Sequence, residues 1–119
     1  MFKFQKLAVW EKSIQWTDGL LEVADSLPQR YQFSFGEQLR RAGISVPTNI
    51  AEGTGRYFSK ESAHFFTIAK GSVYECVNLI IMIARKNLLN QKFSESAIIE
   101  KGEELSKMLS GLIDRNYHQ

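Results

Sequence analysis

The sequence predicts an all-α fold, an antiparallel up-down-up-down four-helix bundle, on three observations. Only two prolines and eight glycines occur in 119 residues, so few turns interrupt the chain. Apolar residues recur three and four positions apart over long stretches, which places them on one face of a helix, and no stretch reads convincingly as a strand. A chain of this length is expected to form one domain, residues 1–119, because folding can bury about two-thirds of the unfolded surface.

The first helix is expected over residues 6–27. Its apolar residues mark two adjacent faces, the pattern of a helix that contacts two neighbours. The helix is expected to end at Leu27, because a residue that precedes a proline, here Pro28, disfavours helical angles.

The second helix is expected over residues 35–52. Ser34 is placed to cap it, with Glu37 completing a capping box, and Gly53 and Gly55 supply its end. Its apolar seam, with spacings of three and four, consists of Leu39, Gly43, Val46, Ile50 and Gly53. This is the repeat of a narrow seam that faces a partner helix.

Pro47 lies inside this second helix. A proline removes one backbone donor and pushes against the carbonyl four residues earlier, at a cost of about 3 kcal/mol. That carbonyl belongs to Gly43, which has no side chain to resist a bend. The sequence therefore predicts one helix, kinked at Pro47.

A polar stripe runs along the opposite face of the same helix and consists of Arg41, Ser45, Thr48 and Glu52. Two interpretations stay open. In the first, the stripe is a surface site. In the second, its hydroxyls and the neighbouring Asn49 amide satisfy carbonyls that the proline frees, and its arginine pairs with Glu52 or Glu75 inside the bundle.

The third helix is expected over residues 60–86, with Ser59 as its cap. From Val73 onward only Glu75 and Asn78 interrupt its hydrophobic surface, so this helix belongs at the centre of an assembly. Together with the two-faced first helix, it presents more apolar surface than one four-helix core can cover. The sequence therefore predicts self-assembly.

Ser94 is expected to cap the fourth helix. This helix places apolar residues on one face and charged residues on the other. The apolar positions are Ile98, Gly102, Leu105, Leu109 and Leu112.

The charge of the chain is weakly positive overall and unevenly distributed. The net charge is +2. Residues 28–93 carry nine Lys and Arg against four Asp and Glu, a net +5, whereas residues 1–27 and 94–119 together carry six against nine, a net −3. A basic central hairpin of this kind can steer a polyanion, but it can equally hold subunits together or belong to solvated faces of mixed charge.

Residues suited to catalysis or metal binding are few and isolated. His64 and His118 have no companion at a spacing typical of a metal site, and Cys76 lies in an apolar run typical of a buried hydrophobe. We therefore expect no metal, no cofactor, no catalytic residue and no enzyme. The longest apolar run, residues 79–84, is too short to cross a membrane, and the N-terminus lacks a secretory signal, so we expect a cytoplasmic protein.

Several motifs resemble one known family, the small four-helix bundle proteins encoded in bacterial 23S rRNA intervening sequences. The most specific motif is the S-x-P-x-N-I-A-E-G string, which contains the structural motif residues Ser45, Pro47, Asn49, Glu52 and Gly53. The other matching residues are Trp10, Pro28, the run QLRRA at 38–42, Arg56 and the run AKGSVYE at 69–75. The chain departs from the usual pattern at Gly43 and Val46, and it has no glutamate after Pro28.

The resemblance implies a left-handed antiparallel four-helix bundle that assembles into a homopentamer. The chain is also similar to the accessory proteins of diversity-generating retroelements, which use a basic outer surface to engage a reverse transcriptase and nucleic acid. Two classes of function follow: a self-assembling bundle that binds RNA or DNA, or an adaptor whose oligomer binds a protein such as a reverse transcriptase.

The candidate nucleic-acid contacts are basic residues in the central part of the chain. Four of them are expected in loops or near helix ends, and two within the second helix are equally expected to be structural. They are Arg30, Arg56, Lys60 and Lys92 in the first group, and Arg40 and Arg41 in the second.

Overall fold

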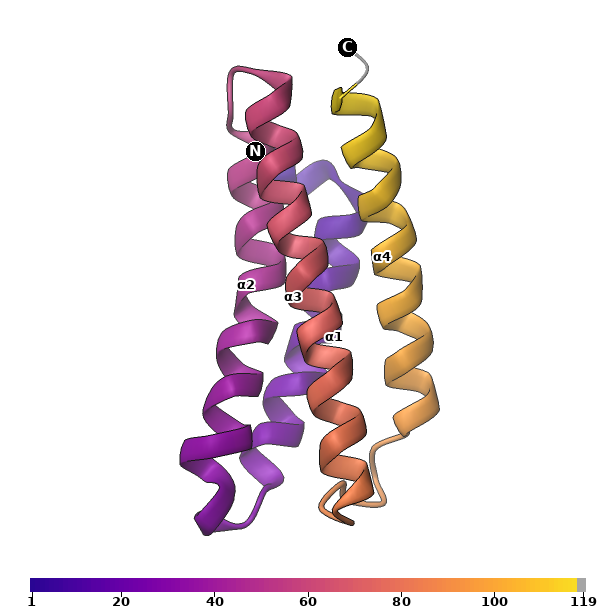
Figure 1. The fold of residues 1–119 in the computed structure, drawn as a ribbon. Helices are drawn as coiled ribbons and strands as arrows, with labels where there is room; N and C mark the ends of the chain where they lie inside the picture. The colour runs from indigo at the N-terminus through magenta and orange to yellow at the C-terminus, as the bar shows by residue number, and fades with distance from the viewer. Residues whose placement is uncertain (118–119) are drawn as a thin grey trace.

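The structure, a computed structural model, describes residues 1–117 and is all-α over that range. Four long helices pack side by side along a molecule that measures 46 × 22 × 22 Å (Figure 1). They are α1 (Ala8–Ser26), α2 (Glu37–Thr54), α3 (Ser59–Arg85) and α4 (Glu95–Tyr117). The prediction of a four-helix all-α fold is confirmed.

Each helix contacts the next along the chain, and α4 also contacts α1. Figure 1 shows the connections α1–α2 and α3–α4 at one end of the molecule and the connection α2–α3 at the other. We call these the lower end and the upper end, as they appear in that view. Short helices complete the fold: η1 (Lys3–Lys6) packs against α1 and α2, and η2 (Gln29–Tyr31) and the π-helical η3 (Gln32–Gly36) form the α1–α2 connection.

The core is formed by the apolar faces that the periodicity predicts. All five seam positions of α2 are buried, and α3 buries apolar side chains along its length, among them Ala69, Cys76, Leu79 and Ile83. The largest side chains that are fully enclosed come from all four helices and include Leu20, Leu39, Ile50, Ile80, Ile83, Leu105 and Leu109.

The predicted helix starts are correct for α4 and wrong for α2 and α3. The Ala97 amide donates to Ser94 Oγ at 3.2 Å, so Ser94 caps α4. Ser34 does not cap α2, because the chain is already coiled as a π-helix there and the Ser34 hydroxyl donates back to the Tyr31 carbonyl. In α3, Ser59 is the first helical residue and the extended Phe58 precedes it.

The ends of α2 and α3 are also set differently from expectation. Gly53 lies within the last turn of α2, which continues to Thr54, so only Gly55 stands at its end. At the end of α3, Asn87 adopts a left-handed φ of 59°. The Asn87 and Leu88 amides donate to the carbonyls of Ala84 and Ile83, which closes a Schellman motif.

Gly53 is required by packing. A Cβ built on Gly53 would lie 2.6 Å from Cε1 of Phe66 and 2.9 Å from its Cδ1, closer than real Cβ contacts come. Phe66 itself is buried on α3. The phenyl ring therefore packs directly on the α2 backbone, and this contact sets how closely α2 and α3 approach below their connection.

Pro47 lies inside α2, and the helix continues through it. Since Pro47 has no N–H, the Gly43 carbonyl lacks its usual partner in the helix. The hydroxyl of Thr17, a buried residue of α1, donates to this carbonyl at 2.9 Å. The unpaired acceptor that the proline creates in α2 is thus satisfied from the neighbouring helix.

The interpretation in which the polar stripe of α2 and Asn49 satisfy this carbonyl is wrong. The Thr48 hydroxyl donates to the Ile44 carbonyl, and the Asn49 amide donates to the Ser45 carbonyl and hydroxyl. These are local bonds to residues four positions back, a geometry that cannot reach Gly43. The Ser45 hydroxyl also bonds that of Ser72 at 2.8 Å, which ties α2 to α3.

We predict that Gly53→Ala lowers the free energy of unfolding by about 1 to 3 kcal/mol, because the added methyl group must displace the Phe66 ring. Gly43→Ala is the matched control within the same helix. A Cβ there would meet Leu20 and Thr17 at 3.6 Å or more, which is ordinary contact. Chemical denaturation measures both changes, and equal tolerance would contradict the packing described for Gly53.

We predict that Thr17→Val destabilises the protein by about 1 to 3 kcal/mol, because the Gly43 carbonyl is left buried and unpaired. In the Pro47→Ala background the same change costs less, since the introduced alanine supplies an N–H within the helix. A double-mutant cycle in urea measures this coupling. Thr48→Val, at an exposed position, is the control. If the free-energy costs of the Thr17 and Pro47 changes simply add, the Thr17 hydroxyl does not replace the missing N–H of Pro47.

Candidate functional site

The structure separates the six candidate basic residues into two groups. Arg30, Arg40, Arg41 and Lys92 lie at or near the lower end, whereas Arg56 and Lys60 flank the α2–α3 connection at the upper end. The helical rise alone places Arg41 about 20 Å from Thr54, the last residue of α2, and Arg56 follows that end. These residues therefore form two surfaces within one subunit.

The lower end is basic because its two connections contain cations and no acidic residue. Residues 27–36 and 86–94 include Arg30, Lys86 and Lys92 and no Asp or Glu, and all three cations are exposed. Arg30 lies over the Tyr31 ring at 5.0 Å, and Lys92 lies over the Phe93 ring at 5.1 Å. None of the three forms an ion pair within residues 1–117.

Arg40 is a structural residue that joins α1 to α2. Its guanidinium donates to the Asp25 carboxylate at 2.8 Å and to Gln32 Oε1 at 2.6 Å. The Gln32 amide in turn donates to the carbonyls of Ala24 and Leu27 at the end of α1. This network leaves Arg40 half-buried and engaged.

Arg41 is exposed beside that network and makes no ion pair in the described part of the chain. The expectation that it pairs with Glu52 or Glu75 is wrong. Glu52 lies three turns further along α2, about 16 Å away, and pairs instead with Arg56 at 3.5 Å. The surface interpretation therefore holds for Arg41 and Glu52, whereas Ser45 ties α2 to Ser72 of α3 and Asn49 donates to Ser45 within α2.

The upper end combines cations with exposed aromatic rings. The Arg56 guanidinium lies 4.3 Å from the centre of the Phe65 ring, and Lys60 is exposed in the first turn of α3. Tyr57 and Phe58, which follow Arg56, are 92% and 62% exposed. An open hollow of about 790 Å³ lies between the N-terminal segment and this connection and is lined by Phe2, Lys3, Phe4, Ala51, Glu52, Thr54, Gly55, Arg56 and Tyr57.

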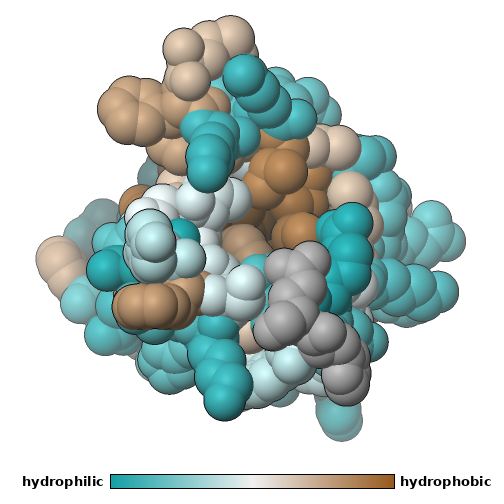
Figure 2. All heavy atoms as spheres, turned by 90° about the horizontal axis from the view of Figure 1, so that it is seen from above, coloured by the Kyte–Doolittle hydropathy of each residue, from teal (hydrophilic) through white to brown (hydrophobic). Residues whose placement is uncertain are grey.

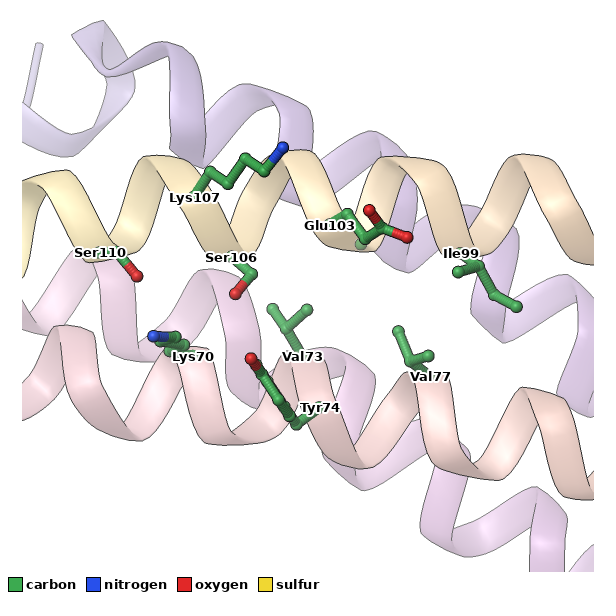
Figure 3. Close-up of a pocket in the computed structure, with 10 residues that line it drawn as sticks. Lys70, Val73, Tyr74, Val77, Ile99, Glu103, Ser106, Lys107 and Ser110 are labelled. Carbon is green, nitrogen blue, oxygen red and sulfur yellow. The ribbon is translucent and has the colours of Figure 1, made fainter.

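A groove of about 560 Å³ runs between α3 and α4 (Figure 3). Val73 and Val77 of α3 and Ile99 of α4 give it an apolar lining. Polar side chains line it as well, namely Lys70 and Tyr74 of α3 and Glu103, Ser106, Lys107 and Ser110 of α4.

The described residues offer little reactive chemistry. Burial raises the pKa of the Cys76 thiol to about 12, so at neutral pH it stays a protonated hydrophobe of the core. His64 is exposed on α3, and His118 lies outside the described residues. Within residues 1–117, no group of three His, Cys, Asp or Glu side chains is placed to hold a metal ion.

One described helix, α3, is long and apolar enough to cross a membrane by length and composition. However, 44% of its most apolar window is buried inside the bundle. Since α3 packs between α2 and α4, its composition is that of a central core helix, and such helices meet the same criterion.

Sequence reasoning missed several residues that shape these surfaces. Thr17 is one, although a threonine on the apolar face of a helix is a signal of a buried hydrogen bond. The aromatic side chains beside Arg56 are others: Tyr57 and Phe58 follow it directly in the sequence, whereas the contact with Phe65 depends on how α3 folds back.

The search of the curated proteins found no match to the chain. The family model described as 23S rRNA-intervening sequence protein matches residues 5–111. This range includes the whole of α1, α2 and α3 and most of α4. The chain therefore belongs to the 23S rRNA-intervening sequence protein family.

Proposed function

We propose that the protein is a non-enzymatic, self-assembling bundle that binds RNA or DNA through basic surfaces repeated around its assembly. One observation carries the proposal: Arg30, Lys86 and Lys92 project from two connections that lie together at the lower end and contain no acidic residue. Phosphate groups are the natural partners of exposed cations left without carboxylates.

The subunit that carries these surfaces is proposed to be a left-handed, up-down-up-down bundle with α2 bent at Pro47. The position of successive connections at alternate ends supports this topology. The missing N–H of Pro47 and its replacement by the Thr17 hydroxyl support a bend, because the backbone there is no longer held by the helix itself.

Self-assembly is supported by the outer surface of α3. Between Thr67 and Met82 its exposed residues include Ile68, Tyr74 and Ile81 but only one charged residue, Glu75. Apolar surface of the kind that α3 exposes is typically covered by another subunit, and a closed ring such as the pentamer suggested by the family resemblance would cover it. The hydrophobic side chains in a hollow at the upper end, seen from above in Figure 2, are separate from this outer surface of α3.

Repetition of the basic surface makes a modest charge effective. One subunit with the three cations of its lower-end connections binds a polyanion weakly, whereas several copies in a ring can engage the same strand together. Contacts to phosphates carry no sequence information, so we expect binding with little sequence preference.

A second candidate function is an adaptor whose oligomer binds a protein such as a reverse transcriptase. The α3–α4 groove favours this candidate, because its apolar lining flanked by Lys70, Lys107 and Glu103 suits a peptide segment of mixed character (Figure 3). Nuclease treatment separates the two candidates: a partner protein stays bound in a pull-down after the nucleic acid is digested.

We predict that light scattering coupled to size exclusion reports several times the subunit mass of 13.6 kDa. Substituting Ile68 and Met82 with Asp should lower that mass, because each places a charge on the apolar outer surface of α3. Ser96→Asp, an exposed change in the first turn of α4, is the control that leaves the mass unchanged. A monomeric parent at micromolar concentration would refute self-assembly.

We predict that nucleic-acid affinity falls steeply with salt and depends on the loop cations. Combined reversal of Arg30, Arg56, Lys60 and Lys92 to Glu should abolish binding without changing the mass of the assembly. Charge reversal of only Arg30 and Lys92, the two lower-end residues of this set, should make the slope of log affinity against log salt less steep by about 2 per subunit engaged. Each lost phosphate contact contributes about 0.9 to that slope.

Lys107→Glu is the control for this experiment, because it changes the charge by the same amount per site at an exposed position in the middle of α4. Fluorescence anisotropy over a salt series gives the affinities. If the fourfold variant binds as the parent does, the nucleic-acid proposal is wrong and the adaptor becomes the better account.

A further inference from the structure

The upper end exposes an unusual concentration of aromatic rings. Phe2 is 73%, Tyr57 92% and Phe58 62% exposed, and we call these three the ring cluster. The Tyr57 and Phe58 rings meet edge to face at 5.0 Å. Rings exposed to this extent gain nothing from the core of their own subunit, so they are free to contact a ligand.

The position of Phe2 is fixed by contacts within the N-terminal segment. Its ring stacks on Phe4 at 5.8 Å, and Phe4 in turn meets Trp10 of α1 at 5.0 Å. The Phe2 amide also donates to Gln5 Oε1 at 2.8 Å. Phe2 and Tyr57 therefore line the same hollow from different segments of the chain.

Cations accompany the ring cluster, but the local charge is nearly balanced. Lys3 and Arg56 line the hollow, and Lys60 is exposed on the first turn of α3. Glu52 and Glu61 offset part of this charge, and the Glu52–Arg56 pair at 3.5 Å is exposed and therefore weak. Phosphate contacts alone would thus give less affinity here than at the lower end.

We propose that the upper end binds single-stranded nucleic acid, with unpaired bases stacked on the ring cluster and phosphates on Lys3, Arg56 and Lys60. The inference rests on the proposed nucleic-acid function and assigns a substrate class to this end. Bases in a duplex are stacked on one another and hide their faces, whereas an open strand presents every face to an aromatic ring. Rings combined with a modest charge favour the open strand.

The test compares a labelled oligouridylate with an RNA duplex of the same length by fluorescence anisotropy, at one salt concentration. The variant is Tyr57→Ala with Phe58→Ala in the full chain. It should weaken single-strand binding by about thirtyfold or more and leave duplex binding unchanged, since two stacking contacts are lost. Tyr57→Phe, which keeps the ring, should bind as the parent does.

Ile44→Ala is the control, because Ile44 is an apolar side chain that is 50% exposed in the middle of α2, away from both ends. Equal losses on strand and duplex, no loss on either, or a change in the mass of the assembly would each overturn the inference. If the parent retains neither nucleic acid, the proposed function itself fails. If the parent binds both with strong salt dependence while the ring variants match it, only the single-strand assignment fails.

Discussion

The hydrogen bond from the Thr17 hydroxyl to the Gly43 carbonyl is the contact on which the first half of the bundle depends. Pro47 leaves that carbonyl without a donor at a depth where water is excluded, and an unpaired buried acceptor costs about 1 to 3 kcal/mol. The donor comes from α1, so the same bond that repairs α2 also fixes the two helices against each other. A Cβ at Gly43 would still meet α1 at ordinary contact distances, so this junction depends on the donor and not on the glycine.

Two close approaches that do depend on glycine fix the remaining helices. At Gly53 the Phe66 ring lies on the α2 backbone, and at Gly102 a Cβ would meet Val77 at 2.8 Å and Trp16 at 3.1 Å. The Trp16 indole also donates to the Ile98 carbonyl at 3.0 Å, which joins α1 to α4. At both glycines, side chains of neighbouring helices pack directly against a helix backbone that carries no side chain there. The connections between helices reach solvent at the two ends of the bundle.

The S-x-P-x-N-I-A-E-G residues of α2 therefore serve mostly to pack the helices together. The exposed cations and rings lie instead at the two ends of the bundle. Ser45 bonds Ser72 of α3 and accepts from Asn49, the carbonyl that Pro47 frees accepts from Thr17 of α1, and Gly53 lies under Phe66. Exposed cations that pair with no carboxylate lie at the lower end, whereas the exposed rings of Phe2, Tyr57 and Phe58 lie at the upper end, where the charge is nearly balanced. If both ends contact nucleic acid, they do so by different physics: charge attraction at one end and stacking at the other.

The sequence by itself determined the helical fold class, the buried faces, the continuity of α2 through Pro47 and the cap at Ser94, because these follow from local spacing and from the chemistry of single residues. It also placed Cys76 in the core. Only the tertiary structure decided that Thr17 supplies the donor for Gly43, that Arg40 joins Asp25 and Gln32, and that Arg41 stays exposed. It alone divided the basic residues between two ends and placed Phe2 and Tyr57 on the lining of one hollow. These are contacts between segments distant in the chain, and periodicity along one helix carries no information about which residue of another helix lies opposite.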